Sequence, residues 1–221
     1  MATFEAQVEG LTGLTIDSSG TTPTQGELTQ FLSDGVCDVI NRIIDLKPQE
    51  IHKFATTSTD SSNSGIVYTG KIISVMRHHD STSIIRSCEP ISADDRYDAT
   101  DEDSLKFRSK HNPGYYILNQ KIFTVPASAG SNNDAVVTQV AYDTGLAFSD
   151  SSIDNFPTEY EYLVAMYAAI KSLEAKMAEY TIDEEDVELV QAIAFNLNSL
   201  KQQYESEIIG QGQPRGTQDE G

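Results

Sequence analysis

The chain has 221 residues, of which 34 are acidic and 15 basic, and its formal net charge is -19 at pH 7. Free nucleic-acid binders and membrane-surface binders both depend on clusters of Lys and Arg, so this surplus of acids argues against both classes. The longest apolar run, Tyr162–Ile170, has nine residues, whereas a membrane-spanning helix needs roughly 20. The N-terminus lacks the basic segment of a secretory signal peptide. We therefore expect a soluble protein that stays inside the cell and has no membrane partner.

The charge is distributed unevenly along the chain. Residues 1–41 contain six acids and no base, residues 42–121 contain eleven of each, and residues 122–221 contain seventeen acids and four bases. Two cysteines, Cys37 and Cys88, are too few for a disulfide scaffold. We expect both to be small buried residues rather than reactive thiols.

The N-terminal segment shows no sustained apolar period over residues 1–23, so we expect an arm or a strand that needs a partner. A helix is predicted from Thr24 to about Leu46, because Glu27 follows Thr24 at the spacing of a capping box. Its apolar residues recur at helical spacing. Pro48 favours the first turn of a second short helix that ends near Ala55.

Residues 64–141 change to the alternating, β-branched pattern of strands. Five strands are predicted: Ile66–Arg77, Ser83–Cys88, Tyr115–Leu118, Lys121–Val125 and Ala135–Ala141. Residues 78–82 would connect one hairpin and Asn119-Gln120 the other, since Asn tolerates a left-handed turn. The acid-rich segment 90–113 is expected to be a long loop with little structure of its own.

A pair of long helices is predicted over residues 156–207. The first has acids near its start and an apolar stripe that includes Leu163, Met166 and Ile170. Asp183 would cap the second, whose stripe includes Leu197, Leu200 and Tyr204. The short link between them predicts an antiparallel pair.

Together these elements predict an α+β fold in which a helical bundle is combined with a small antiparallel β-hairpin region. The bundle consists of the N-terminal helix and the C-terminal helix pair. We expect one domain over residues 24–209, with helices at 24–55, the β region at 64–141 and the helix pair at 156–207. An N-terminal arm (1–23) and an extended C-terminal tail (210–221) flank it.

No residue pattern indicates catalysis. His78 and His79 are adjacent on a predicted strand, so their side chains would point to opposite faces and could not easily share a metal ion. The acidic loop 94–103 could collect a divalent ion but lacks the ligand order of a calcium loop. The acids at 183–186 would offset a helix dipole. Since nucleophile and phosphate-binding motifs are also missing, we expect a non-enzymatic protein without a cofactor or metal.

Five stretches together resemble the small virion proteins of marine tailed phages. They are MATFEAQVEGLTGL at the N-terminus, Ser19–Gly35, the pair ISVMR and IIRSCEPI, PGYYILNQKIFTVPA, and FPTEYEYLVAMYAAIKSLE. Proteins of this kind are similar to head-to-tail adaptors, or connectors. These form a ring, usually dodecameric, between the portal and the tail, and they conduct the packaged DNA.

The resemblance implies a location in the virion neck, after assembly in the host cytoplasm. It implies that residues 1–20 reach a neighbouring subunit and that the C-terminal tail docks on the portal protein, through Gly210, Gln211, Gln213, Pro214 and Arg215. The helix pair would form the ring wall, with subunit contacts through Leu163, Met166, Ile170, Leu197, Leu200 and Tyr204. Its partners would be other copies of the chain, the portal, and tail tube, nozzle or stopper proteins. Double-stranded DNA would pass through without specific binding.

Three other readings remain open. A capsid cement protein would be present in hundreds of copies per virion, and a tail terminator or tube protein would form sixfold rings. A metal-dependent enzyme or a soluble host regulator would need a bound ion or a self-sufficient monomer.

Overall fold

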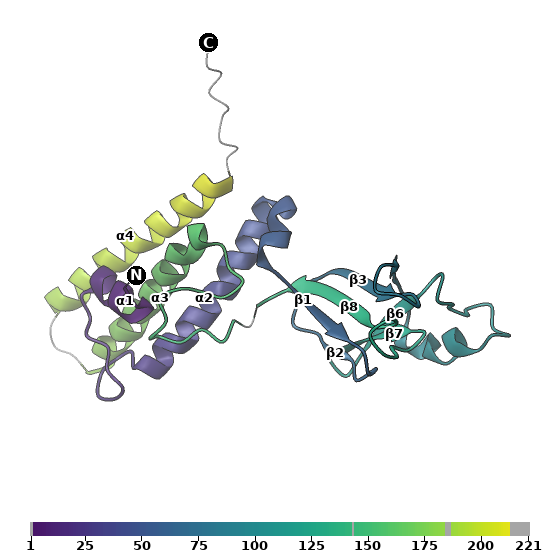
Figure 1. Ribbon diagram of the computed structural model, residues 1–221. Helices are drawn as coiled ribbons and strands as arrows, with labels where there is room; N and C mark the ends of the chain where they lie inside the picture. The colour runs from purple at the N-terminus through teal and green to yellow at the C-terminus, as the bar shows by residue number, and fades with distance from the viewer. Residues whose placement is uncertain (1, 143, 184–186, 213–221) are drawn as a thin grey trace, which may run out of the picture. The chain divides into compact units, whose positions relative to one another are not determined.

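The computed structural model describes residues 2–142, 144–183 and 187–212. The chain as a whole combines α and β structure, and its internal contacts divide it into two compact units (Figure 1). The helical unit contains residues 1–54 and 142–221, and the β unit contains residues 55–141. The division differs from the single domain over 24–209 expected from the sequence, because the β region is inserted between helices that pack on one another. No helix in the described ranges has the length and hydropathy needed to cross a membrane.

The helical unit contains four α-helices and one 3₁₀ helix within its described residues. They are α1 (Phe4–Thr12), α2 (Gln25–Leu46), η1 (Pro48–Phe54), α3 (Thr158–Asp183) and α4 (Val187–Gly212). Helix α2 confirms the predicted helix and its start: the Thr24 hydroxyl accepts from the Glu27 backbone N–H, and the Glu27 carboxylate accepts from the Thr24 backbone N–H. Eight residues of α2 are buried along one face.

Helix α1 corrects the expectation of an arm or strand near the N-terminus. Thr3 caps its start, and Gly13 ends it in the left-handed conformation, with φ of 70°. Phe4 and Val8, four residues apart, are buried, and the helix contacts α3. A helix of nine residues shows too few apolar positions for a period to be visible, and packing on α3 stabilises it.

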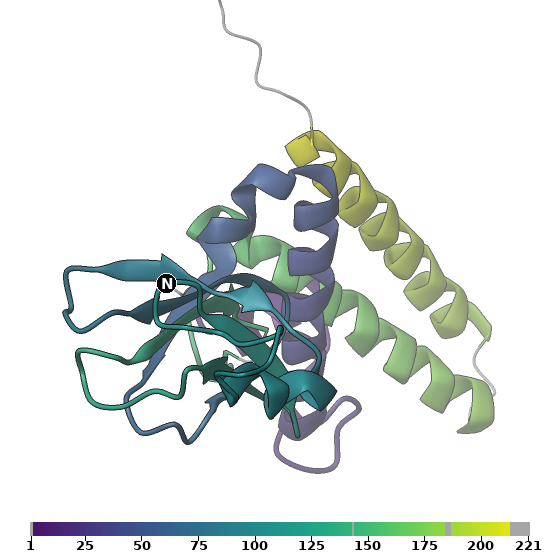
Figure 2. The same cartoon turned by 90° about the vertical axis from the view of Figure 1, so that its right-hand side faces the viewer.

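Helix α3 forms the centre of the helical unit. It contacts α1, α2 and α4, and Figures 1 and 2 both draw α4 alongside it. Its buried residues from Leu163 to Leu173 occupy most of the circumference, as expected of a helix covered on several sides. Tyr162 near the start of α3 donates to Glu207 near the end of α4, so the two helices run in opposite directions.

The β unit consists of two sheets of four strands each. The first has the order β1 (Ala55–Asp60), β8 (Ala135–Val140), β3 (Ile72–His78), β4 (Ile85–Ser87). The second has the order β2 (Ile66–Val67), β7 (Lys121–Val125), β6 (Gly114–Leu118), β5 (Glu89–Pro90). All pairs are antiparallel except β5 with β6. One buried cluster takes residues from both sheets: Ile66, Val75, Cys88, Ile122, Ala135 and Val137.

The predicted strand Ile66–Arg77 is wrong as a single strand. It divides into β2 and β3, which belong to different sheets. Between β2 and β3 the chain crosses from one sheet to the other, and the buried Gln139 side chain binds the backbone of this crossing. Its amide oxygen accepts from the Thr69 N–H, and its amide nitrogen donates to the Val67 carbonyl. A second crossing follows β4, where the chain passes through the buried Cys88 to β5 of the other sheet.

Between β6 and β7, Asn119 and Gln120 have φ of 50° and 57°. Two positive φ values suit a two-residue connection between twisted antiparallel strands. The segment between β5 and β6 contains two short 3₁₀ helices, η2 (Ala93–Arg96) and η3 (Asp98–Thr100), where the sequence indicated only a loop.

Candidate functional site

The residues expected to form the ring wall lie in the core of the helical unit. Leu163, Met166, Ile170, Leu197, Leu200 and Tyr204 are between 0% and 6% exposed. Since the same chain already covers these side chains, they contribute to its own packing, and any contact with another subunit would use other residues. The apolar side chains that α4 does expose include Phe195, at 79%, and Ile209, at 58%.

The expected portal-docking tail begins inside a helix. Gly210 and Gln211 belong to the last turn of α4, which ends at Gly212. The Gln211 amide donates to the Tyr162 hydroxyl at 3.4 Å. Gln213, Pro214 and Arg215 lie outside the described residues. Asp183, expected to cap the second long helix, is instead the last residue of α3, and residues 184–186 are not described.

The adjacent histidines contact different partners. The His78 imidazole is bound to the Asp134 carboxylate, whereas the His79 ring lies 4.6 Å from that of His111, between centroids. Among the described residues, no group of three or more His, Cys, Asp or Glu side chains is arranged to hold a metal ion. Burial raises the pKa of the Cys88 thiol to about 12 although Arg77 is nearby, so Cys88 remains protonated at neutral pH.

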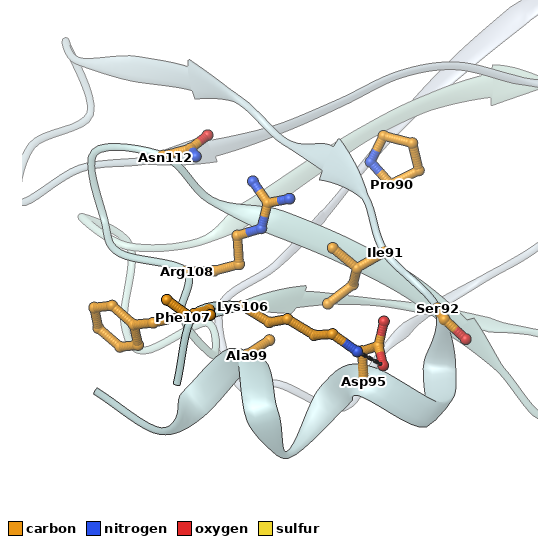
Figure 3. A pocket seen from close by; sticks show the side chains of 10 residues that line it. Pro90, Ile91, Ser92, Asp95, Ala99, Lys106, Phe107, Arg108 and Asn112 are labelled. Atoms are coloured by element: carbon orange, nitrogen blue, oxygen red, sulfur yellow. Dashed lines mark hydrogen bonds and ion pairs between the residues drawn. The ribbon is translucent and has the colours of Figure 1, made fainter. Parts of the chain in front are cut away.

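A concave site in the β unit lies at the acid-rich segment between β5 and β6. It is a cavity of about 470 Å³ (Figure 3), within the range of roughly 300–1,000 Å³ that small-molecule sites occupy. Its lining residues are Pro90, Ile91, Ser92, Asp95, Ala99, Leu105, Lys106, Phe107, Arg108 and Asn112.

Local hydrogen bonds hold the walls of this pocket in place. The Ser92 hydroxyl caps η2 by accepting from the Asp94 backbone N–H. Ala99 is buried, and its carbonyl accepts from the Arg108 backbone N–H at 2.9 Å. This bond joins the two halves of the segment. The pocket is therefore built by ordered turns rather than by a gap between loosely held chains.

Two ion pairs lie across the pocket wall. The Lys106 ammonium is 2.7 Å from Asp95, and Figure 3 shows the Lys106 side chain extending to that carboxylate. The hydrogen bond to Asp95 raises the pKa of Lys106, so the ammonium remains charged well above neutral pH. The Arg108 guanidinium is 2.5 Å from Glu89. Because both cations already have carboxylate partners, the pocket offers an incoming anion little uncompensated positive charge.

Sequence reasoning did not find this pocket. It identified acids between Asp94 and Asp103 and weighed a divalent ion, but two of these acids, Asp95 and Asp98, form ion pairs with Lys106 instead. The available signal was the presence of Leu105 and Phe107 in a polar loop without helical or strand period. Such residues can equally turn inward to a core, so only the fold shows that they border a surface cavity.

Comparison with protein-family models finds no match to this chain, and comparison with curated proteins finds none either.

Proposed function

We propose that this chain is a non-enzymatic virion protein, a head-to-tail adaptor that forms a ring between portal and tail and conducts DNA. The sequence resemblance to small virion proteins of marine tailed phages motivates the proposal. The structural observation that supports it is the concentration of negative charge in the helical unit. That unit carries 24 acids and seven bases, whereas the β unit carries ten acids and eight bases.

A surplus of carboxylates suits a conduit for DNA. Lys and Arg hold a duplex by neutralising phosphates and releasing counterions, which would retain the passing genome. Carboxylates repel the phosphates and let the duplex slide. On this proposal the bundle of α2, α3 and α4 forms the ring wall, and its channel face is net negative. Double-stranded DNA is then cargo rather than a specifically bound ligand.

The ring contacts must use side chains that the chain itself leaves exposed. Phe195 on α4 is the most exposed aromatic residue of the helical unit, at 79%. Aromatic side chains contribute disproportionately to protein interfaces, because they bury a large area with few rotatable bonds. We therefore place Phe195 in the contact with a neighbouring subunit, in place of the six buried residues named from the sequence. The end of α4, at Gly210 and Gln211, leads into the portal-docking tail, which continues through Gln213, Pro214 and Arg215.

Counting copies in purified virions tests the proposal. Quantitative mass spectrometry should find about a dozen copies per particle, and electron microscopy should place them in a ring at the neck. Hundreds of copies would indicate a capsid cement protein, and a sixfold ring would indicate a tail terminator or tube protein. Complete absence from particles would overturn a virion role.

A substitution at Phe195 tests the ring contact separately. Phe195→Ser should lower the number of copies incorporated at least severalfold while the circular dichroism spectrum of the purified chain stays unchanged. Gln191→Ser, at another exposed position of the same helix, serves as the matched control and should be incorporated normally. Normal incorporation of Phe195→Ser would show that the subunits meet elsewhere.

A further inference from the structure

The pocket between β5 and β6 has an apolar rim that faces solvent. Leu105 is fully exposed and Phe107 is 37% exposed, although the cores of both units bury most of the large apolar side chains. Scattered exposed apolar residues are normal, but here two of them border one cavity together with Ile91 and Ala99. The cavity therefore offers an apolar contact surface to a ligand that approaches from solvent.

Leu105 is held outward by the backbone around it. The Ser104 N–H donates to the Asp101 carbonyl, the Lys106 N–H donates to the Ser104 hydroxyl, and the Phe107 N–H donates to the Ser104 carbonyl. These bonds lie on both sides of Leu105 and fix the turn that carries it. Its exposure is thus a property of an ordered turn, and binding through it costs little additional conformational entropy.

The surroundings of this rim are strongly acidic. Residues 89–108 contain seven acids and three bases. Lys106 is bonded to Asp95 and Arg108 to Glu89, and Arg96 lies over the Tyr97 ring, with its guanidinium carbon 4.3 Å from the centroid. Asp94, Glu102 and Asp103 form no salt bridge within the part of the chain that the structure describes. Their charges remain available to a cation that approaches Leu105.

We propose that this acid-rimmed pocket binds a segment of a partner protein that presents an apolar side chain flanked by lysine or arginine. The apolar side chain enters between Ile91, Ala99 and Phe107, and the flanking cations meet the carboxylates at 101–103. A volume of about 470 Å³ accommodates one or two side chains, so one short segment is the fitting ligand.

Charge favours this occupant over the alternatives. Nucleic acid would bring phosphates toward a surface with a surplus of acids, which repels them. A second copy of this chain would have to offer a basic surface, yet its helical unit carries 24 acids against seven bases. The pocket and its rim lie within the β unit alone, so this binding does not depend on ring formation.

Titration of the ¹⁵N-labelled full-length chain with short peptides tests the proposal. The probe is an acetylated, amidated peptide of sequence Lys-Lys-Leu-Leu-Lys-Lys. It should bind saturably and shift the amide resonances of residues 90–112. Two control peptides replace either the leucines by serine or the lysines by glutamate, and both should bind at least tenfold more weakly.

The control peptides distinguish a built site from general attraction to an acidic protein. Equal binding of the serine peptide, or resonance shifts spread over the helical unit, would show general attraction and overturn the proposal. Absence of saturable binding by the leucine peptide would overturn it as well. Preference for the glutamate peptide would assign the pocket to acidic ligands instead.

Substitutions in the chain test which residues contribute to peptide binding. Leu105→Ser should weaken binding of the leucine peptide at least threefold, and its full exposure makes an effect on folding negligible. Replacing Asp101, Glu102 and Asp103 by their amides should weaken it further and reduce its dependence on salt. The matched control is Ile117→Ser, another exposed apolar position of the β unit that does not line the pocket. An equal loss of peptide affinity in Leu105→Ser and Ile117→Ser would contradict the assignment of the site.

Discussion

At the scale of single residues, polar side chains next to the helical core form specific hydrogen bonds and ion pairs. The buried Tyr160 donates its hydroxyl to Glu50 at 2.7 Å, and Lys53 lies 3.2 Å from the same carboxylate oxygen. Burial alone would raise the pKa of Glu50, but the hydrogen bonds from Tyr160 and Lys53 and the charge of Lys47 outweigh it, and the net effect lowers the pKa. Glu50 therefore links the first turn of η1 to α3 most strongly when it is ionised.

Replacing Glu50 should make unfolding less sensitive to acid. A carboxyl whose pKa is lowered by folding stabilises the protein fully above its ordinary pKa, near 4.5, and loses this contribution as the pH falls through the folded value. Glu50→Gln should therefore cost about 1–2 kcal/mol at pH 7 and less at pH 3. Urea denaturation at both pH values measures the difference.

The exposed Glu159, which also pairs with Lys53, provides the control. Because exposed ion pairs contribute little, Glu159→Gln should change the free energy of unfolding by less than about 1 kcal/mol at either pH. An equal cost of Glu50→Gln at pH 3 and pH 7 would point to lost packing rather than to the charge.

At the scale of elements, sequence reasoning succeeded where a local signal coincided with the packed structure. The Thr24–Glu27 box and the long apolar stripe predict α2 almost to the residue. It failed at α1, which is too short for a visible period, and at Ile66–Arg77, where a β-branched run hides a change of sheet. That crossing depends on the side chain of Gln139, more than 60 positions away along the chain. No local pattern encodes such a contact, and the same holds for the pocket between β5 and β6.

Removing the cap of α2 should destabilise the helical unit by a predictable amount. Thr24→Ala leaves the Glu27 backbone N–H without its hydroxyl partner and should lower the free energy of unfolding by about 1 kcal/mol. Thr24→Ser retains a hydroxyl at the same place and should be nearly neutral. Thermal unfolding followed by circular dichroism at 222 nm compares the two. A loss of similar size in Thr24→Ser would mean that the methyl group, rather than the cap, carries the effect.

At the scale of the whole molecule, the chain has two cores rather than one. Leu163 is buried at the centre of the helical unit, and Val137 belongs to the cluster between the two sheets. Charge follows the same division, since the acids in excess are concentrated in the helical unit. The sequence showed the charge asymmetry but could not show the division, because residues 1–54 and 142–221 are joined only by long-range packing.

Separate cores predict separate responses to core substitutions. Leu163→Ala should lower the stability of the helical unit by about 2–5 kcal/mol through lost contacts and the cavity left behind, while the β unit keeps its own cluster intact. Native-state hydrogen exchange should then show faster exchange of the slowest amides in α2 and α3, with those in β3 and β8 unchanged. Val137→Ala should have the reverse pattern. If either substitution accelerated exchange of the slowest amides of both units equally, the chain would unfold as one cooperative body. The stability of each unit would then be set by unfolding of the whole chain rather than by its own core.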